Sequence, residues 1–161
     1  MFSRARSGLV DIETGVVEQS TGPEVRTQAL FRDRLVAVVR AGSPAERGGL
    51  SETAYADGLH VVVSRTGDER DAVDLPFLPA LPPRRVGAVA SGFSAAVALA
   101  RGSDMIATIP ERHTAALLAG MATFSLPMPA VEFTVSMLWH PRMDADPAHR
   151  WLRGCLREAC A

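Results

Sequence analysis

The sequence contains no lysine: its 17 basic residues are all arginine, and with 18 acidic residues they give a net charge of −1. Without an excess of positive charge, the chain by itself has no electrostatic basis for binding a nucleic-acid backbone. Cysteine is scarce, with only Cys155 and Cys160. These two lie five residues apart on a predicted helix and point in different directions, so we expect reduced structural thiols in a cytoplasmic protein.

Long apolar runs and common catalytic motifs are also absent. No stretch approaches the about 20 apolar residues of a membrane-spanning helix, and the first residues lack the apolar centre of a signal peptide. No serine or cysteine lies in a G-x-S-x-G elbow, and there is no G-x-G-x-x-G or phosphate-binding loop. No pair among the histidines has metal-ligand spacing on a helix. We therefore expect no enzyme, cofactor or metal ion. The histidines are His60, His113, His140 and His149.

The 161 residues are 47% hydrophobic, enough for a packed core. Residues 84–112 carry the clearest pattern, a strand, a helix, a second strand and a helix start. Strand-length apolar runs cover 85–90 and 105–109, and Ser91 is placed to cap a helix over 92–101 that is apolar on nearly every face and so expected to be buried. Pro110 suits the first turn of the next helix. Strands alternating with helices over short loops predict a parallel sheet.

The rest of the chain continues this alternation of strands and helices. Residues 32–34 divide an apolar stretch, 25–39, into two strands, and Asp144 to Pro147 form a helix start. Residues 40–49 are expected to be a loop that leaves one structural unit for another, and residues 124–129, with two prolines, an extended connecting segment. Further strands are predicted at 9–17, 59–64 and 131–139, and further helices at 50–56, 111–119 and from 147 onward.

Ligands of parallel sheets bind beyond the carboxyl ends of the strands, where helix N-termini present free N–H groups. Residues 91–93, 110–112 and the polar loop 65–70 should therefore face one crevice. Arg112 is the favoured ligand contact, because a cation in the first turn of a helix opposes the helix dipole. The alternative is a surface ion pair of Arg112 with Glu111 or Asp104.

Two carboxylates, Asp33 and Asp68, are candidates for a pair in the same crevice. The alternative is that they are solvated or paired with neighbouring arginines. Phe31 and Phe93 are candidates for the ligand wall, although aromatic side chains at such positions are more often part of the core. The neighbouring arginines are Arg32, Arg34 and Arg70.

Several segments together resemble the effector-binding region of LysR-type transcriptional regulators, from about Val10 to the C-terminus. The similarity is greatest to the branch whose members sense aromatic acids and related molecules. One departure is Ser43-Pro44, where the family usually has His-Pro. The segments are LFRDRLVAVVR (30–40), Arg84-Arg85-Val86, SDMIATIP (103–110), Trp139-His140 and DPAHRWLR (146–153).

The resemblance implies an α/β fold of two lobes, like a type 2 periplasmic binding protein, with a small organic effector between the lobes. Lobe II would be residues 41–124, a small parallel-rich sheet flanked by helices, and lobe I would combine residues 1–40 and 125–161. An aromatic or carboxylate-bearing effector is expected, although Asp33 and Asp68 stand where related sensors carry histidines, which also admits a neutral or amine-bearing one. The implied effector-binding residues are Phe31, Asp33, Thr66, Asp68, Ser91, Phe93, Arg112, Phe133 and Val135.

Compared with the family, a helix-turn-helix DNA-binding domain and the first part of lobe I are absent from this sequence. We therefore expect an effector-sensing fragment of a regulator that contacts DNA only through a domain not present here, and contacts no membrane. The incomplete lobe I would leave an apolar sheet edge, which predicts a homo-oligomer. The alternative function is a stand-alone binding or interaction module that pairs with related regulators through this edge.

Overall fold

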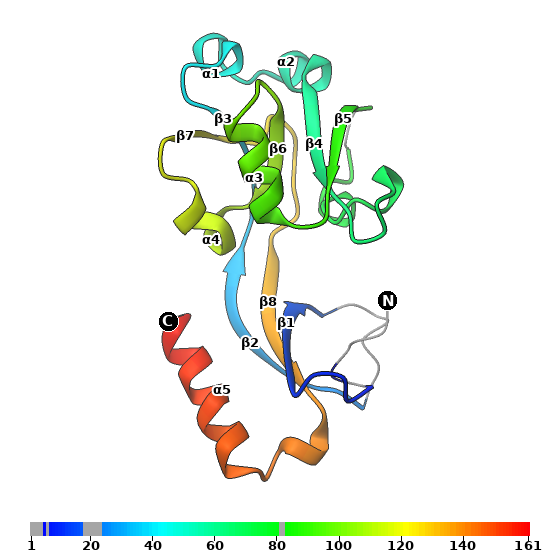
Figure 1. Ribbon diagram of the computed structural model, residues 1–161, viewed down its shortest axis with the longest axis vertical. Coiled ribbons are helices and arrows are strands. Elements are labelled where there is room, and N and C mark those ends of the chain that lie inside the picture. Colours follow the sequence, from blue (N-terminus) through cyan, green and yellow to red (C-terminus); the bar gives the residue numbers. More distant parts are fainter. Residues whose placement is uncertain (1–4, 6, 18–23, 81–82) are drawn as a thin grey trace. The chain divides into compact units, whose positions relative to one another are not determined.

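The computed structural model describes residues 5, 7–17, 24–80 and 83–161, and it divides into two compact units (Figure 1). One unit combines residues 1–32 with 133–161, and the other is residues 33–132. Residues 33–40 and 125–132, which the resemblance assigned to lobe I, have their backbone contacts within the second unit. The lobe boundaries themselves stay a prediction.

The second unit contains a five-stranded sheet in the order β5-β4-β6-β3-β7. The first three strands, β5 (Arg85–Ala90), β4 (Leu59–Val63) and β6 (Ile106–Pro110), are parallel as predicted. The sheet is nevertheless mixed, because β3 (Leu35–Arg40) runs antiparallel to both β6 and β7 (Met121–Ser125). The chain enters this unit at the carboxyl ends of the parallel strands, so β3 has to run the opposite way.

Helix α3 (Phe93–Arg101) packs on one face of this sheet, as Figure 1 shows. Ala96, Val97 and Ala100 are buried against valines of β3 and β4, but Leu99 on the outer face is 40% exposed. The prediction of a helix buried all round was wrong, because only one side of it meets the sheet. The predicted cap was also wrong: the helix begins one residue later, with Gly92 at the N-cap position and no side-chain cap.

The opposite face of the sheet carries a second core and a buried polar network. Tyr55, from α2 (Glu52–Asp57), is fully buried, and its hydroxyl lies 2.7 Å from Thr108 Oγ1. His60 Nε2 lies 2.7 Å from the carbonyl oxygen of Tyr55. Arg84 donates two hydrogen bonds to Asp74, of 2.5 and 3.2 Å, and both side chains are about 5% exposed. A buried, bidentate ion pair therefore lies in this unit beside the tyrosine and the histidine.

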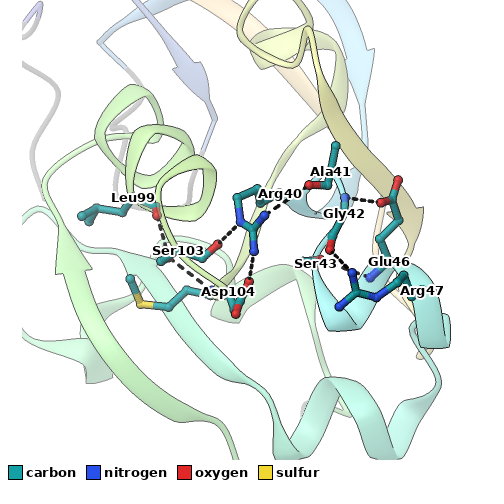
Figure 2. Close-up of polar contacts among 10 residues, drawn as sticks. Arg40, Ala41, Gly42, Ser43, Glu46, Arg47, Leu99, Ser103 and Asp104 are labelled. Atoms are coloured by element: carbon teal, nitrogen blue, oxygen red, sulfur yellow. Dashed lines mark hydrogen bonds and ion pairs between the residues drawn. The ribbon is translucent and has the colours of Figure 1, made fainter.

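Two predicted connections contain regular structure. Residues 40–49 include α1 (Pro44–Gly48), because Ser43 Oγ accepts the N–H of Glu46 and so caps a helix that starts with proline. Figure 2 shows how Arg40 anchors this corner, with a 2.6 Å ion pair to Asp104 and a 3.3 Å hydrogen bond to the carbonyl of Ser103. The extended segment predicted over 124–129 begins within the edge strand β7, of which residues 124 and 125 are the last two.

The remaining helical segments of this unit are short. The predicted helix 111–119 is α4 (Glu111–Thr114) followed by a 3-10 turn (Ala115–Leu117), so it ends two residues earlier than predicted. Gly120 lies in the turn after this segment and has a φ of 74°. Such a left-handed conformation favours glycine. Two further 3-10 turns cover Glu69–Asp71 and Leu75–Phe77.

The first unit contains a three-stranded sheet in the order β1-β8-β2, formed by β1 (Ile12–Val16), β8 (Phe133–Trp139) and β2 (Arg26–Asp33). A 3-10 turn (Pro141–Met143) and α5 (Pro147–Ala159) follow β8. Asp146 caps α5 as predicted, through a 2.7 Å bond from the N–H of His149. Trp151 was predicted to share the apolar face of α5 but is 71% exposed.

Side chains join α5 to the strands of the same unit. His149 Nε2 lies 2.9 Å from the carbonyl oxygen of Asp11, and the Arg153 guanidinium stacks 4.6 Å from the ring of Trp139. Cys155 and Cys160 are both half-buried. Across the described residues, the longest helices are too short or too polar to cross a membrane.

We expect Asp74→Ala to lower the free energy of unfolding by about 3–5 kcal/mol, because it leaves the Arg84 charge buried without its partner. Equilibrium urea denaturation measures this loss. Asp68→Ala is the matched control, since Asp68 also forms a bidentate ion pair with an arginine, Arg70, but at the surface. Equal losses in both variants would contradict a special role of the buried pair.

We expect the protein to lose stability as the pH falls below about 6.5, the ordinary pKa of histidine. Burial lowers the pKa of His60, and its bond to the Tyr55 carbonyl only partly opposes this effect. Below this pH the unfolded chain binds a proton at His60 that the folded chain does not bind. The free energy of unfolding therefore falls by up to about 1.4 kcal/mol per pH unit. Urea denaturation at several pH values should show a shallower pH dependence for His60→Met, and an unchanged dependence would contradict this assignment.

Candidate functional site

The carboxyl edge of the five-stranded sheet gathers residues from four parts of the chain. β4, β5 and β6 are parallel and so end at the same edge, and Ser64 N donates to the Ala90 carbonyl there, at 2.9 Å. β3 begins at this edge, because Leu35 pairs with Pro110. Residues 33–34, 64–66, 91–93 and 111–113 are therefore neighbours at one end of the sheet. Five of the predicted site residues lie in these segments: Asp33, Thr66, Ser91, Phe93 and Arg112.

Asp33 holds the N-terminus of α4 at this edge. Its Oδ1 accepts the N–H of Arg112 at 2.9 Å, and its Oδ2 accepts the N–H of His113 at 2.9 Å. The N–H of Arg34 also donates to Oδ1, at 2.8 Å, and Asp33 is only 6% exposed. A carboxylate at the positive end of a helix is favourable, so this contact stabilises the α4 start.

Arg34 and Glu111 form a second contact between the start of β3 and the start of α4. Glu111 N donates to the Arg34 carbonyl at 2.9 Å, while the Arg34 guanidinium donates to both carboxylate oxygens of Glu111, at 2.6 and 3.2 Å. This contact holds the pKa of Glu111 below its usual range. The carboxylates of Asp33 and Glu111 are therefore both bonded within the chain.

Arg112 and His113 lie in the first turn of α4 and are exposed. The two acidic residues considered as alternative partners of Arg112 bind other arginines, Glu111 with Arg34 and Asp104 with Arg40. The His113 ring meets Phe93 edge to face, with centroids 5.8 Å apart. Phe93 is partly buried and packs against the α3 core, so it joins the core to this edge.

The polar loop after β4 supplies hydroxyl groups and a second ion pair. Ser64 Oγ lies 3.2 Å from Thr66 Oγ1. Asp68 binds the backbone N–H and the guanidinium of Arg70, which lowers the pKa of Asp68 to about 2. The alternative that Asp68 pairs with Arg70 is confirmed. Ser91 is exposed at the edge and does not cap α3.

Three other predicted site residues lie in strands of the three-stranded sheet. Phe31, on β2, is half-buried, while Phe133 and Val135, on β8, are each 8% exposed. They belong to the first compact unit, and their role in effector binding stays a prediction.

Sequence reasoning missed His113 and Ser64 at this edge, and it missed the helix-capping role of Asp33. A helix cap is usually read from the residue just before the helix, whereas Asp33 precedes α4 by 78 residues. No local signal marks such a contact, because it depends on the pairing of β3 with β6. Among the described residues, no group of three His, Cys, Asp or Glu side chains is placed to hold a metal ion.

Residues 2–161 match the model of the LysR substrate binding domain. The chain belongs to the LysR substrate-binding domain family. It is 33% identical over 162 residues to the HTH-type transcriptional regulator LinR of Sphingobium indicum, covering 98% of this chain and 53% of LinR. As a LysR effector-binding domain, it has the mixed α/β, periplasmic-binding-protein-like fold that the resemblance implied.

Solved structures agree with this LysR assignment. The probable transcriptional regulator PA0477 from Pseudomonas aeruginosa matches with a TM-score of 0.80 and 25% identity, over 96% of this chain and 52% of that one. The effector binding domain of QuiR, solved in complex with shikimate, shares the fold with a TM-score of 0.73 and 15% identity, over 98% of this chain and 75% of that one. The chain spans about half the length of the curated relatives it matches.

We expect Asp33→Ala to destabilise the protein by about 2 kcal/mol, because the N–H groups of Arg112 and His113 lose a buried, charged acceptor. Hydrogen exchange should accelerate at these two amides more than in α3. Asp104→Ala, which removes an exposed carboxylate, serves as the control. If the two amides exchange at the wild-type rate in Asp33→Ala, the capping role is wrong.

Proposed function

We propose that the carboxyl edge of the five-stranded sheet binds a small organic effector, aromatic or carboxylate-bearing, and that this binding regulates transcription in the cytoplasm. The observation that carries the proposal is the anchoring of α4 by Asp33, which fixes Arg112 at the carboxyl end of β6, the parallel neighbour of β4. The curated relatives are transcriptional regulators, which supports a regulatory role over a catalytic one.

The hydrogen bonds already formed at this edge suggest which group recognises an anion. The first N–H groups of α4 already bind Arg34 and Asp33, so they are not available to an effector carboxylate. A guanidinium matches a carboxylate with two parallel hydrogen bonds, which gives Arg112 that role. We assign hydrogen bonding to the hydroxyls of Thr66 and Ser91, and contact with an aromatic ring to Phe93.

The other predicted residues take supporting parts in this proposal. Asp33 acts as a positioning residue, since both of its carboxylate oxygens hold α4 and its side chain is buried. Asp68 orders the loop through Arg70. The complex of the QuiR effector binding domain with shikimate supports the view that this fold admits a small organic molecule.

We expect an effector of the aromatic-acid class to raise the melting temperature by a few degrees, because it binds only the folded chain. A thermal-shift screen of aromatic acids and amines identifies it. Arg112→Ala should weaken binding of a carboxylate hit by about 10- to 100-fold in calorimetry, since it loses charge-assisted hydrogen bonds.

Arg47→Ala is the control for this experiment, because Arg47 is also exposed but lies on α1, after the far end of β3. It should leave the affinity unchanged. A carboxylate that binds Arg112→Ala as tightly as wild type would refute the placement of the site. A screen in which neither acids nor amines raise the melting temperature would count against effector sensing itself.

A further inference from the structure

The chain between β4 and β5 (Figure 1) begins with the polar loop 65–71, which contains Thr66 and Asp68 of the proposed effector site. None of residues 65–70 is buried. The hydrogen bond from the N–H of Asp68 to Thr66 Oγ1, at 3.3 Å, shapes the loop but does not attach it to the sheet. Since no buried side chain of residues 65–70 ties the loop to the sheet, its position depends on the chain at its two ends.

Both ends of the loop are attached to the carboxyl end of β4. At the entry, the buried Ser64 donates its N–H to the Ala90 carbonyl at 2.9 Å, and it also forms an antiparallel bridge with Ala72. At the exit, the N–H of Val73 donates to the Val63 carbonyl, again at 2.9 Å. The entry continues directly from a strand, whereas the exit depends on what holds the segment after Val73.

The side chain of Asp74 holds this segment. Asp74 stands at the N-cap position of the 3-10 turn Leu75–Phe77, where an aspartate usually accepts a backbone N–H, but its carboxylate makes no such bond. Both carboxylate oxygens instead accept hydrogen bonds from the Arg84 guanidinium, at 2.5 and 3.2 Å, and both side chains are buried. Two parallel bonds between planar groups specify one relative orientation, so this pair fixes both the place and the direction of the segment.

Stability alone does not account for a buried ion pair. Taking two charges out of water is costly, and apolar side chains of similar size can often replace such a pair without loss of stability. Apolar packing is non-directional, however, so it does not supply the orientation that the ion pair gives. Arg84 also interacts with Tyr55, whose hydroxyl lies 2.7 Å from Thr108 Oγ1. The ion pair therefore links the segment after the loop to α2 and to β6, the strand that leads to Arg112.

We propose that Asp74 and Arg84 are positioning residues for the effector site: their ion pair holds the exit of the loop 65–71 and so keeps Thr66 in place for the effector. The inference rests on the proposed function, in which Thr66 contacts the effector. Asp74 and Arg84 themselves are buried and are not expected to touch it. Without the pair, the loop occupies its binding position for only part of the time, and the apparent affinity falls by that fraction.

The double variant Asp74→Leu/Arg84→Met tests this role separately from stability. It removes both charges together, and Tyr55 keeps its contact with Thr108, so its urea midpoint should be close to that of wild type. Benzoate, the simplest aromatic carboxylate, is the probe. We expect calorimetry to show about tenfold weaker binding than in wild type, as for a loop that is correctly placed roughly a tenth of the time.

Arg40→Met/Asp104→Leu is the matched control, since it replaces another arginine–aspartate pair of this unit, one that is exposed and lies at the far end of β3. It should bind benzoate as wild type does. If Asp74→Leu/Arg84→Met is as stable as wild type and also binds benzoate as tightly, the ion pair serves stability only and the proposal is wrong.

Hydrogen exchange without benzoate gives a second readout. The amides of Asp68, Arg70 and Val73, which donate hydrogen bonds in the loop and at its exit, should exchange faster in Asp74→Leu/Arg84→Met, whereas those of α3 should not change. Exchange at the wild-type rate would overturn the proposal. If wild type does not bind benzoate, the proposed function for aromatic carboxylates is contradicted, but the exchange of these three amides still decides whether the pair positions the loop.

Arg84→Lys keeps the proposal testable if the double variant does not fold. Lysine retains the positive charge but does not form the two parallel bonds of the guanidinium. We therefore expect a smaller loss of benzoate affinity in the same direction, together with faster exchange at Val73. Wild-type affinity combined with wild-type exchange in Arg84→Lys would overturn the positioning role.

Discussion

The candidate site depends on the contact between the start of β3 and the start of α4. Three successive N–H groups of the helix, those of Glu111, Arg112 and His113, donate to Arg34 and Asp33. These groups would otherwise be unsatisfied at a helix N-terminus. The contact therefore fixes a four-residue helix that has too few internal hydrogen bonds to be stable alone. It also fixes the backbone position of Arg112 next to the strand ends, because Arg112 lies in the helix turn whose N–H groups bind Asp33.

The opposite face of the same sheet places a second constraint on this unit. Arg84 and Asp74 are buried together, and a buried ion pair is tolerated only where each charge is matched. Among the described residues the Nδ1 atom of the fully buried His60 has no hydrogen-bond partner, and burial lowers the pKa of this histidine, which favours its neutral form. One face of the sheet is thus an apolar contact with α3, whereas the other combines apolar packing with a polar network that fixes the positions of α2 and the segment around Asp74.

The sequence predicted the elements whose signals are local. Continuous apolar runs located β3, β4, β5 and β6, and Asp146-Pro147 located the start of α5. Predictions failed where the decisive contact is distant in sequence. The direction of β3 in the sheet, the exposed face of α3 and the edge strand β7 all depend on which neighbours pack against them. The role of Asp33 was missed for the same reason, since an aspartate between two arginines looks like a surface charge until its strand is paired with β6.

The two sheets also differ in how far neighbouring elements bury their strands. In the five-stranded sheet the inner strands β4, β6 and β3 are almost entirely buried, and α3 also contacts the edge strand β5. Among the described strands of the three-stranded sheet, β8 alone has a strand on each side, and β8 is the strand with nearly continuous burial. Four of the five residues of β1 are half-buried and Thr14 is exposed, whereas the five residues of β8 that pair with them are all buried, because β8 lies between two strands.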